Sequence, residues 1–555
     1  MPAVNSEGPA KPSRPRGGFA TLVAAGILLS RLTGLAREKV FSYYFGNSDA
    51  AGVFKAATRI PNFLQNMLGE GVLSASFIPV YARLLAEGDE ELAGRVAGII
   101  ATLLTLVVAL VVILGVIFTP YLLWAIAPGF KGEVRELTIR IVRILFPGIG
   151  LLVLYAWCIG IMNSHGKFFL AYVAPVLMNI TTIATMIIFA RRVSDQRSLV
   201  IALAWGWVVG AALQLGLQVP FVFRYAKPLK FAVETTLEPV REILRNFTPV
   251  VVGRGVVQLS AWLDNLLASL LSTGAVSALG YAQTISLLPV SLFGMSVAAA
   301  ELPQMSRVVG AEAEVFATLR KRMERGLRQI AFFVIPSVVA FIAIGNALVA
   351  ALYEGGHFGP GDTLLVWYIL IGSTVGLLAV TLGRLYSSAF YALRDTRTPL
   401  RFAMLRVALT GVLGYLFALP LRPLLIDALR LAHVPLPMIQ GSTKPLGTIA
   451  LTATAGVAGW LEFLLLRRAL GRRIGAVPVS PGYLMRLWTS AVMAGVAGAL
   501  FYAFVTPRLG AYLPRFLPHI RDGLIVCGIF GVFYFAVTLL LGVPEAKATL
   551  ARLRR

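Results

Sequence analysis

The segment VAGIIATLLTLVVALVVILGVIFTPYLLWAI, from Val96 to Ile126, decides the fold class because it contains no charged residue. A helix needs about 20 consecutive, mostly apolar residues to cross the hydrocarbon core of a bilayer. The segment exceeds that length, and it lacks the alternation of polar and apolar residues that is typical of membrane β-barrel strands. It therefore predicts a membrane-spanning α-helix.

The same apolar character extends over the whole chain of 555 residues. Apolar residues make up 57% and charged residues 14%, against roughly 45–50% and 25% in soluble domains. A soluble fold with this composition would expose more apolar surface than a monomer tolerates. The long apolar runs exclude a disordered chain and a nucleic-acid-binding domain, and the two isolated cysteines exclude a disulfide scaffold. We predict an all-α polytopic membrane protein.

Windows of about 20 mostly apolar residues predict about fourteen transmembrane helices. They start near Gly18, Ala51, Leu92, Arg135, Phe168, Leu199, Ile243, Val276, Gln329, Leu364, Phe402, Gly447, Tyr483 and Gly523. The predicted organisation is a disordered cytoplasmic tail (1–17), an N-lobe of helices 1–6 (18–226), a cytoplasmic linker (227–242), C-lobe helices 7–11 (243–422), an extracytoplasmic loop (423–446), helix 12 (447–470), helices 13 and 14 (471–543) and a basic cytoplasmic tail (544–555).

The formal net charge of +24 comes from 50 Lys and Arg against 26 Asp and Glu. Cytoplasmic loops of membrane proteins collect Lys and Arg, and with the N-terminus inside roughly 28 of them fall in cytoplasmic segments and roughly 10 outside. The charge distribution therefore predicts that both termini are cytoplasmic.

Charged residues also occur inside the predicted spans, where lipid cannot solvate them. The first span carries Arg31, Arg37 and Glu38. A charge at the centre of a membrane helix costs about 2.5–3.5 kcal/mol on insertion scales, so such residues face the protein interior or a water-filled cavity. In the second span, steps of four, three, four and four residues predict a polar stripe on one helix face, with Gln65 beside it: Lys55, Arg59, Asn62, Asn66 and Glu70.

Later spans add Arg254, Asp264, Gln283 and Arg384, and bases outnumber the main buried acids Glu38, Glu70 and Asp264. This surplus favours a cationic cavity that binds an anionic substrate, while structural ion pairing is the alternative. A pyrophosphate group is well suited to such a cavity because arginine forks bind phosphate oxygens in pairs.

The sequence shows no catalytic constellation, no histidine spacing suited to a metal and no nucleotide-binding glycine motif. We therefore expect a transporter without a cofactor, driven by a coupling ion of unknown identity, by the membrane potential or by the gradient of its own cargo.

Several motifs resemble the MurJ/MviN-type lipid II flippases, which belong to the multidrug/oligosaccharidyl-lipid/polysaccharide exporter superfamily. They are Ser30-Arg31-Leu32-Thr33-Gly34-Leu35-Ala36-Arg37-Glu38, Arg59-Ile60-Pro61-Asn62, Glu70-Gly71, Tyr353-Glu354-Gly355-Gly356-His357-Phe358 and the turn from Phe390 to Pro399. The resemblance implies two six-helix lobes around a central cationic cavity, alternating access, and a groove for a polyprenyl tail on the last two helices. By motif position, Arg31, Arg37 and Glu38 match cavity residues, and Glu70 matches an acidic residue of the second helix.

The function implied by this resemblance is translocation of undecaprenyl-pyrophosphate-linked peptidoglycan precursor, lipid II, to the outer leaflet of the bacterial inner membrane. The implied partners are lipid II or a similar glycan lipid, membrane lipids and cell-wall synthesis enzymes, and no nucleic acid. The chain departs from the family pattern at Gln65, where the family usually carries an arginine, and at Gln283-Thr284, where it usually carries Asp-Arg. A cation-coupled multidrug exporter, an exporter of another lipid-linked oligosaccharide and a membrane scaffold remain alternatives.

Overall fold

The computed structural model describes residues 17–226, 228–306, 311–431, 433, 444–509 and 518–553. Within these ranges the regular elements are helices, apart from one isolated β-bridge between Gly355 and Phe358. Eleven helical segments of the described chain are long and apolar enough to cross a membrane. They are α5 (Glu90–Ile126), α6 (Gly132–Ser164), α7 (Phe168–Ala190), α8 (Gln196–Tyr225), α10 with α11 (Thr273–Pro289 and Ser296–Ser306), α12 (Glu312–Ala343), α14 (Pro360–Ala392), α15 (Arg397–Ala418), α17 (Gly447–Ile474), α18 (Pro481–Leu500) and α20 (Pro518–Leu540).

The other predicted spans start near Gly18, Ala51 and Ile243, and each contains charged residues. They correspond to α1 (Gly17–Phe45), to the succession α2 (Asp49–Ala57), α3 (Arg59–Leu68) and α4 (Glu70–Ala86), and to α9 (Glu238–Leu271). The all-α polytopic class is confirmed, and the count of about fourteen spans stays a prediction.

The second predicted span is not one helix. It is interrupted at Thr58 and again at Gly69, whose extended backbone (φ −91°, ψ −144°) ends α3. Pro61 has no N–H to donate to the preceding turn, which weakens the helix at the first break. The prediction of one continuous polar stripe on a single helix from Lys55 to Glu70 is therefore wrong, because its members are divided among three helices.

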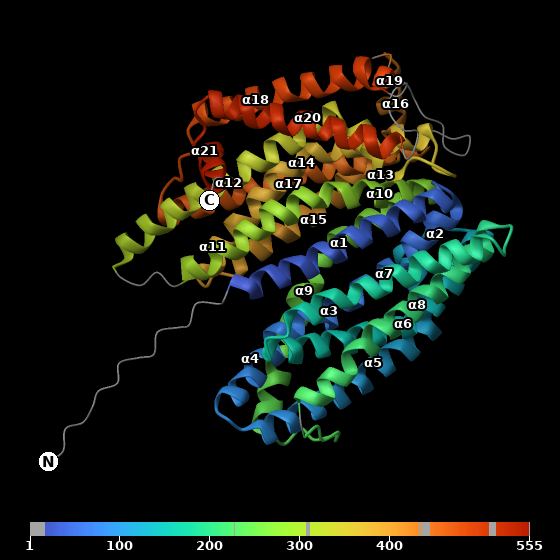
Figure 1. Cartoon of the computed structure of the whole chain (residues 1–555), viewed down its shortest axis with the longest axis vertical. Coiled ribbons are helices and arrows are strands. Elements are labelled where there is room, and N and C mark those ends of the chain that lie inside the picture. The colour runs from blue at the N-terminus through green and yellow to red at the C-terminus, as the bar shows by residue number, and fades with distance from the viewer. Residues whose placement is uncertain are drawn as a thin grey trace.

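The helices form two groups that converge at the end of the molecule where α2 meets α10 and spread apart toward α4 and α11 (Figure 1). In the first group α1 packs on α7, and α8 packs on α6 and α7. In the second group α14 packs on α12 and α17. Helix α9 contacts α3, α4 and α5 on one side and α10 and α15 on the other, so it connects the two groups.

The connection between α8 and α9 contains no helix from residue 228 to 237, so α9 begins inside the predicted linker of 227–242. Two ion pairs hold the connection between α8 and α9 against α5. Arg95 pairs with Glu234 at 2.8 Å, and Lys230 pairs with Glu91 at 2.9 Å.

The last helices lie on the outside of the second group (Figure 1). Tyr534 of α20 donates a hydrogen bond to the Phe332 carbonyl of α12 at 2.6 Å. Two segments predicted as loop or tail contain helices: α16 (Arg422–Leu431) and α21 (Pro544–Leu553). Residues 1–16, 434–443 and 554–555 of the predicted tails and loop lie outside the described residues.

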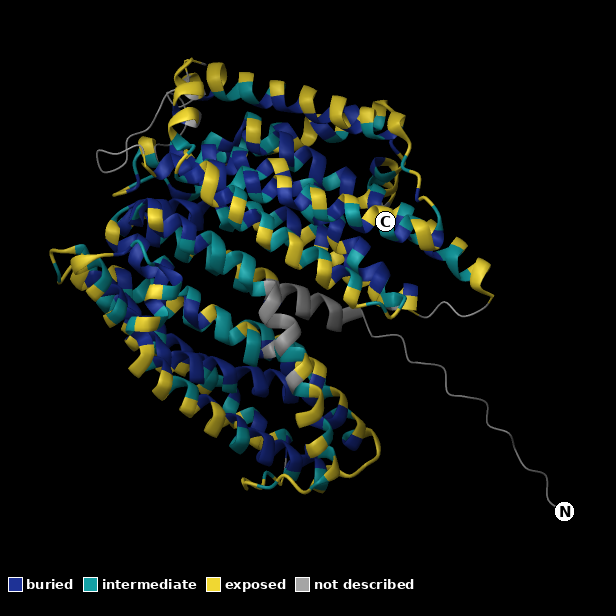
Figure 2. Ribbon diagram, turned by 180° about the vertical axis from the view of Figure 1, so that it is seen from behind, coloured by how far each residue is buried: buried dark blue, intermediate teal, exposed yellow. Residues whose placement is uncertain are grey.

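Exposed residues concentrate on the outward faces of the peripheral helices, as the ribbon in Figure 2 shows. Many of them are large and apolar, among them Leu110 and Ile117 on α5 and Val496 on α18. A lipid environment explains this surface, because lipid tails solvate apolar side chains without cost.

Candidate functional site

A cavity of about 240 Å³ lies where the two groups of helices meet. Its charged and polar lining comes from α1, α2, α3, α7 and α10 and from the Thr58 break: Arg37, Glu38, Lys55, Thr58, Arg59, Asn62, Thr182, Gln283 and Thr284. Lys55 and Arg59 are four residues apart on either side of Thr58, a spacing that places side chains on one helix face, and both line this space. We call this space the cationic cavity.

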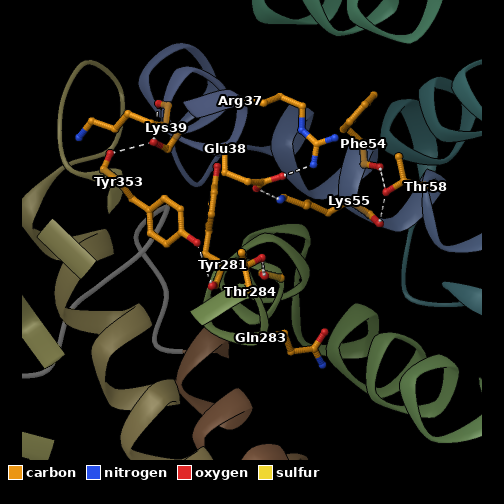
Figure 3. A network of polar contacts seen from close by, with 12 residues as sticks. Arg37, Glu38, Lys39, Phe54, Lys55, Thr58, Tyr281, Gln283, Thr284 and Tyr353 are labelled. Atoms are coloured by element: carbon orange, nitrogen blue, oxygen red, sulfur yellow. Dashed lines mark hydrogen bonds and ion pairs between the residues drawn. The ribbon is translucent and has the colours of Figure 1, made fainter. Parts of the chain in front are cut away.

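Glu38 is the centre of the polar contacts in the cationic cavity (Figure 3). One carboxylate oxygen accepts from Arg37 at 3.0 Å and the other accepts from the Lys55 ammonium. The Lys55 ammonium also lies 5.0 Å from the Phe41 ring centre and 4.9 Å from the Tyr281 ring centre. Aromatic faces attract cations, so these rings hold Lys55 in place beside the carboxylate.

Two amide side chains fix the guanidinium groups of the cationic cavity. Arg37 donates to Asn179 Oδ1 of α7 at 3.2 Å, and Arg59 donates to Gln283 Oε1 of α10. The second bond joins α3 to α10 across the cavity. Three cationic side chains (Arg37, Lys55 and Arg59) and one carboxylate (Glu38) line the cavity, so three minus one leaves a formal surplus of two positive charges.

A second cavity of about 200 Å³ adjoins the first through Gln283, which lines both. Its polar lining includes Asp264, Arg384 and Arg406. Arg406 of α15 pairs with Glu462 of α17 at 3.3 Å and donates to Ser260 of α9 at 3.3 Å. Here the charges are closer to balance, because Asp264 and Glu462 offset the two arginines.

The structure does not bring all the predicted site residues together. Arg37, Glu38, Lys55, Arg59, Asn62 and Gln283 line the cationic cavity, and Asp264 and Arg384 line the second one with Gln283. Arg31 is exposed on α1, and neither cavity is lined by Arg31, Gln65 or Asn66. The side chains of Glu70 and Arg254 lie outside the described residues.

Sequence reasoning missed Asn179, Arg406 and Glu462. All are polar residues inside apolar spans, which was a usable signal. Glu462 is a further acid inside an apolar span, and it is the ion-pair partner of Arg406.

The end where α1 turns into α2 is closed by direct contacts. Tyr281 of α10 donates to the Gly46 carbonyl at 2.8 Å, and the His357 N–H donates to the Tyr43 carbonyl at 2.9 Å. A Cβ atom at Gly52 would lie 2.3 Å from the Thr273 carbonyl oxygen. We call this contact of residues 43–52 with residues 273–281 and 353–358 the sealed end.

Replacing Glu38 by glutamine is expected to lower the free energy of unfolding by about 2 kcal/mol, because the change leaves two partly buried cations without their counter-charge. Thermal unfolding in detergent measures this. Glu91→Gln removes the partner of Lys230 in an exposed pair and should change stability by less than about 1 kcal/mol. Equal effects of the two changes would contradict the central position given to Glu38.

The family model for lipid II flippase MurJ matches residues 41–433. The chain belongs to this family. It is 28% identical to the lipid II flippase MurJ of Burkholderia cenocepacia over 94% of this chain and 96% of that protein. A probable lipid II flippase MurJ from Haemophilus influenzae is 30% identical over 71% of this chain and 79% of that protein. The family is one of transporters and not of enzymes.

Solved structures agree on the fold. A structure of lipid II flippase MurJ in an inward closed conformation matches with a TM-score of 0.70, 22% identity, and coverage of 94% of this chain and 99% of that chain. An inward-facing multidrug resistance transporter of the MATE family matches with a TM-score of 0.60, 20% identity, and coverage of 82% and 98%. Together with the bacterial relatives, the apolar helices identify a multi-pass protein of the bacterial inner membrane.

Proposed function

We propose that this protein translocates lipid II, the undecaprenyl-pyrophosphate-linked peptidoglycan precursor, from the inner to the outer leaflet by alternating access of the cationic cavity. Membership of the lipid II flippase family supports the proposal. The observation that carries it is the surplus of positive charge in the cavity, whose lining has three cations, Arg37, Lys55 and Arg59, and one carboxylate, Glu38. A pyrophosphate head group needs such a shielded cationic path, because an anion does not cross the hydrocarbon core unaided.

The same observation argues against the multidrug-exporter alternative. A transporter for cationic drugs needs a cavity in which acids prevail, because a cation is stabilised by negative charge. In the described residues the cationic cavity has the opposite balance.

We further propose that both termini face the cytoplasm and that the membrane potential assists transport. Moving one elementary charge through 100 mV changes the free energy by about 2.3 kcal/mol. A head group with about two negative charges would therefore gain roughly 4–5 kcal/mol on moving outward across an inside-negative membrane of that potential. A coupling ion is the alternative driving force.

The decisive experiment is depletion of the protein in its own host. Lipid-linked muropeptide is expected to accumulate on the cytoplasmic leaflet, and restored expression should clear it. The leaflet distribution is measured by the accessibility of the precursor to an impermeant reagent in intact cells. An unchanged distribution in depleted cells, with the protein verified as absent, would refute the proposed function.

A further inference from the structure

An apolar crevice of about 650 Å³ lies between α3, α5, α6 and α9. Most of its lining is hydrophobic, including Phe63, Leu114, Phe118, Leu122 and Trp262. Leu114 and Phe118 are 43% and 49% exposed, so the crevice opens at the outer surface of α5, where lipid contacts the protein. We call this space the α5 crevice.

The inner end of the α5 crevice is polar. Arg59 and Asn62 line both the crevice and the cationic cavity, so the two spaces share a wall. At its other limit, where Ile126 lines the crevice, α9 is joined to α5, because Asn265 donates to the Ile126 carbonyl at 3.2 Å. On its floor a Cβ atom at Gly115 would lie 2.0 Å from the Phe146 ring, so only glycine allows α5 and α6 to approach this closely. The crevice therefore has a polar inner end, apolar walls and an opening to lipid.

We propose that the α5 crevice holds the polyprenyl chain of the substrate while its pyrophosphate occupies the cationic cavity. This proposal rests on the proposed function and adds the route of the lipid chain. A chain covalently attached to a head group beside Arg59 must leave the cavity within a few bonds. The α5 crevice begins at that same arginine and offers an apolar path to the membrane.

The location differs from the groove that family resemblance implies for the last two helices. Helices α18 and α20 pack on α12 and α13 (Gly345–Tyr353) at the far side of the molecule from α5 (Figure 1), and they contribute no residue to the α5 crevice. The crevice runs along α5 from Val111 to Ile126, the half of the helix near the sealed end. Under the predicted orientation this half lies in the outer leaflet, so the crevice holds the chain on the side to which the substrate is delivered.

The test is photo-cross-linking on the full-length protein in lipid vesicles. A benzophenone amino acid replaces Leu114 in the crevice, Ile117 on the same helix or Val496 on α18. Ile117 is the matched control because it is 58% exposed and does not line the crevice. The probes are labelled undecaprenyl pyrophosphate and labelled phosphatidylglycerol.

We expect undecaprenyl pyrophosphate to label position 114 about tenfold more than position 117, and Arg59→Gln to remove most of that excess, since the charged hydrogen bonds lost are worth roughly a factor of ten or more. Phosphatidylglycerol should label both positions alike. Filling the crevice with Leu114→Trp should slow transport, whereas Ile117→Trp should not.

Three results would overturn the proposal, because each describes an ordinary lipid contact. They are equal labelling of positions 114 and 117, labelling of position 114 that is unchanged by Arg59→Gln, and preferential labelling of position 114 by phosphatidylglycerol. Labelling at 496 alone, with precursor still accumulating on depletion, would reject the crevice and leave the proposed function standing. No labelling at any position together with no accumulation would reject both.

Discussion

Arg59→Gln is expected to reduce transport of the lipid-linked precursor by at least about 100-fold while the protein still inserts and folds. Arg59 lines the cationic cavity and the α5 crevice, and it bonds Gln283 across the interface of the two helix groups. Losing two charge-assisted hydrogen bonds to a pyrophosphate costs about 3 kcal/mol or more, which corresponds to a factor of more than 100. Complementation of a flippase-depleted strain, with membrane levels checked by immunoblot, measures the effect.

Arg31→Gln is the matched control for this result. Arg31 is also an intramembrane arginine of a predicted span, but it is exposed and lines neither cavity. We expect its replacement to reduce transport less than Arg59→Gln does. Normal complementation by Arg59→Gln would refute the assignment of the anion site, and loss of complementation by Arg31→Gln alone would move that site toward the start of α1.

Gly52→Ala is expected to prevent the sealed end from closing. The new Cβ would lie 2.3 Å from the Thr273 carbonyl oxygen, and a backbone atom cannot rotate out of the way as a side chain does. Overpacking of this kind costs about 1–3 kcal/mol, so the population of the sealed state should fall by up to about 100-fold. Transport should fail because alternating access needs both states.

The state of the sealed end is read from the labelling rate of a cysteine introduced as Thr284→Cys in the cavity wall, with Cys158 and Cys527 replaced by alanine. An impermeant thiol reagent added from outside should react faster in the Gly52→Ala protein. Gly216→Ala is the control, because nothing lies within 4 Å of a Cβ placed there. Unchanged labelling and transport in Gly52→Ala would show that the contact at Thr273 does not limit closure.

The fold class was predictable because a long apolar segment in lipid can satisfy its own backbone hydrogen bonds only as a helix. The site was predictable only in part. The charge surplus correctly indicated polar interior space at Arg37, Lys55 and Arg59, since charged side chains avoid lipid wherever they are in the chain. Helical spacing grouped Asn66 with Arg59 and Asn62, and all three are on α3, but Asn66 lines neither cavity. Periodicity indicates the face of a helix and not how far along that face a cavity extends.

The partners of the charged residues were less accessible to sequence reasoning. Asn179 reaches Arg37 from a helix 142 positions further along the chain, and Arg406 finds Glu462 on another helix. Such pairs depend on which helices become neighbours, and apolar periodicity carries no information about that.

The carboxylate of Glu38 has a consequence for turnover. Because it already binds Arg37 and Lys55, an arriving phosphate must compete with a tethered anion for the same donors. That competition weakens binding of the phosphate, but the Glu38 carboxylate also takes the place of the phosphate on Arg37 and Lys55 when the phosphate leaves. A carrier whose vacant cationic cavity is partly neutralised by its own carboxylate holds the cargo less tightly and returns with less uncompensated charge, so this acid favours speed over affinity.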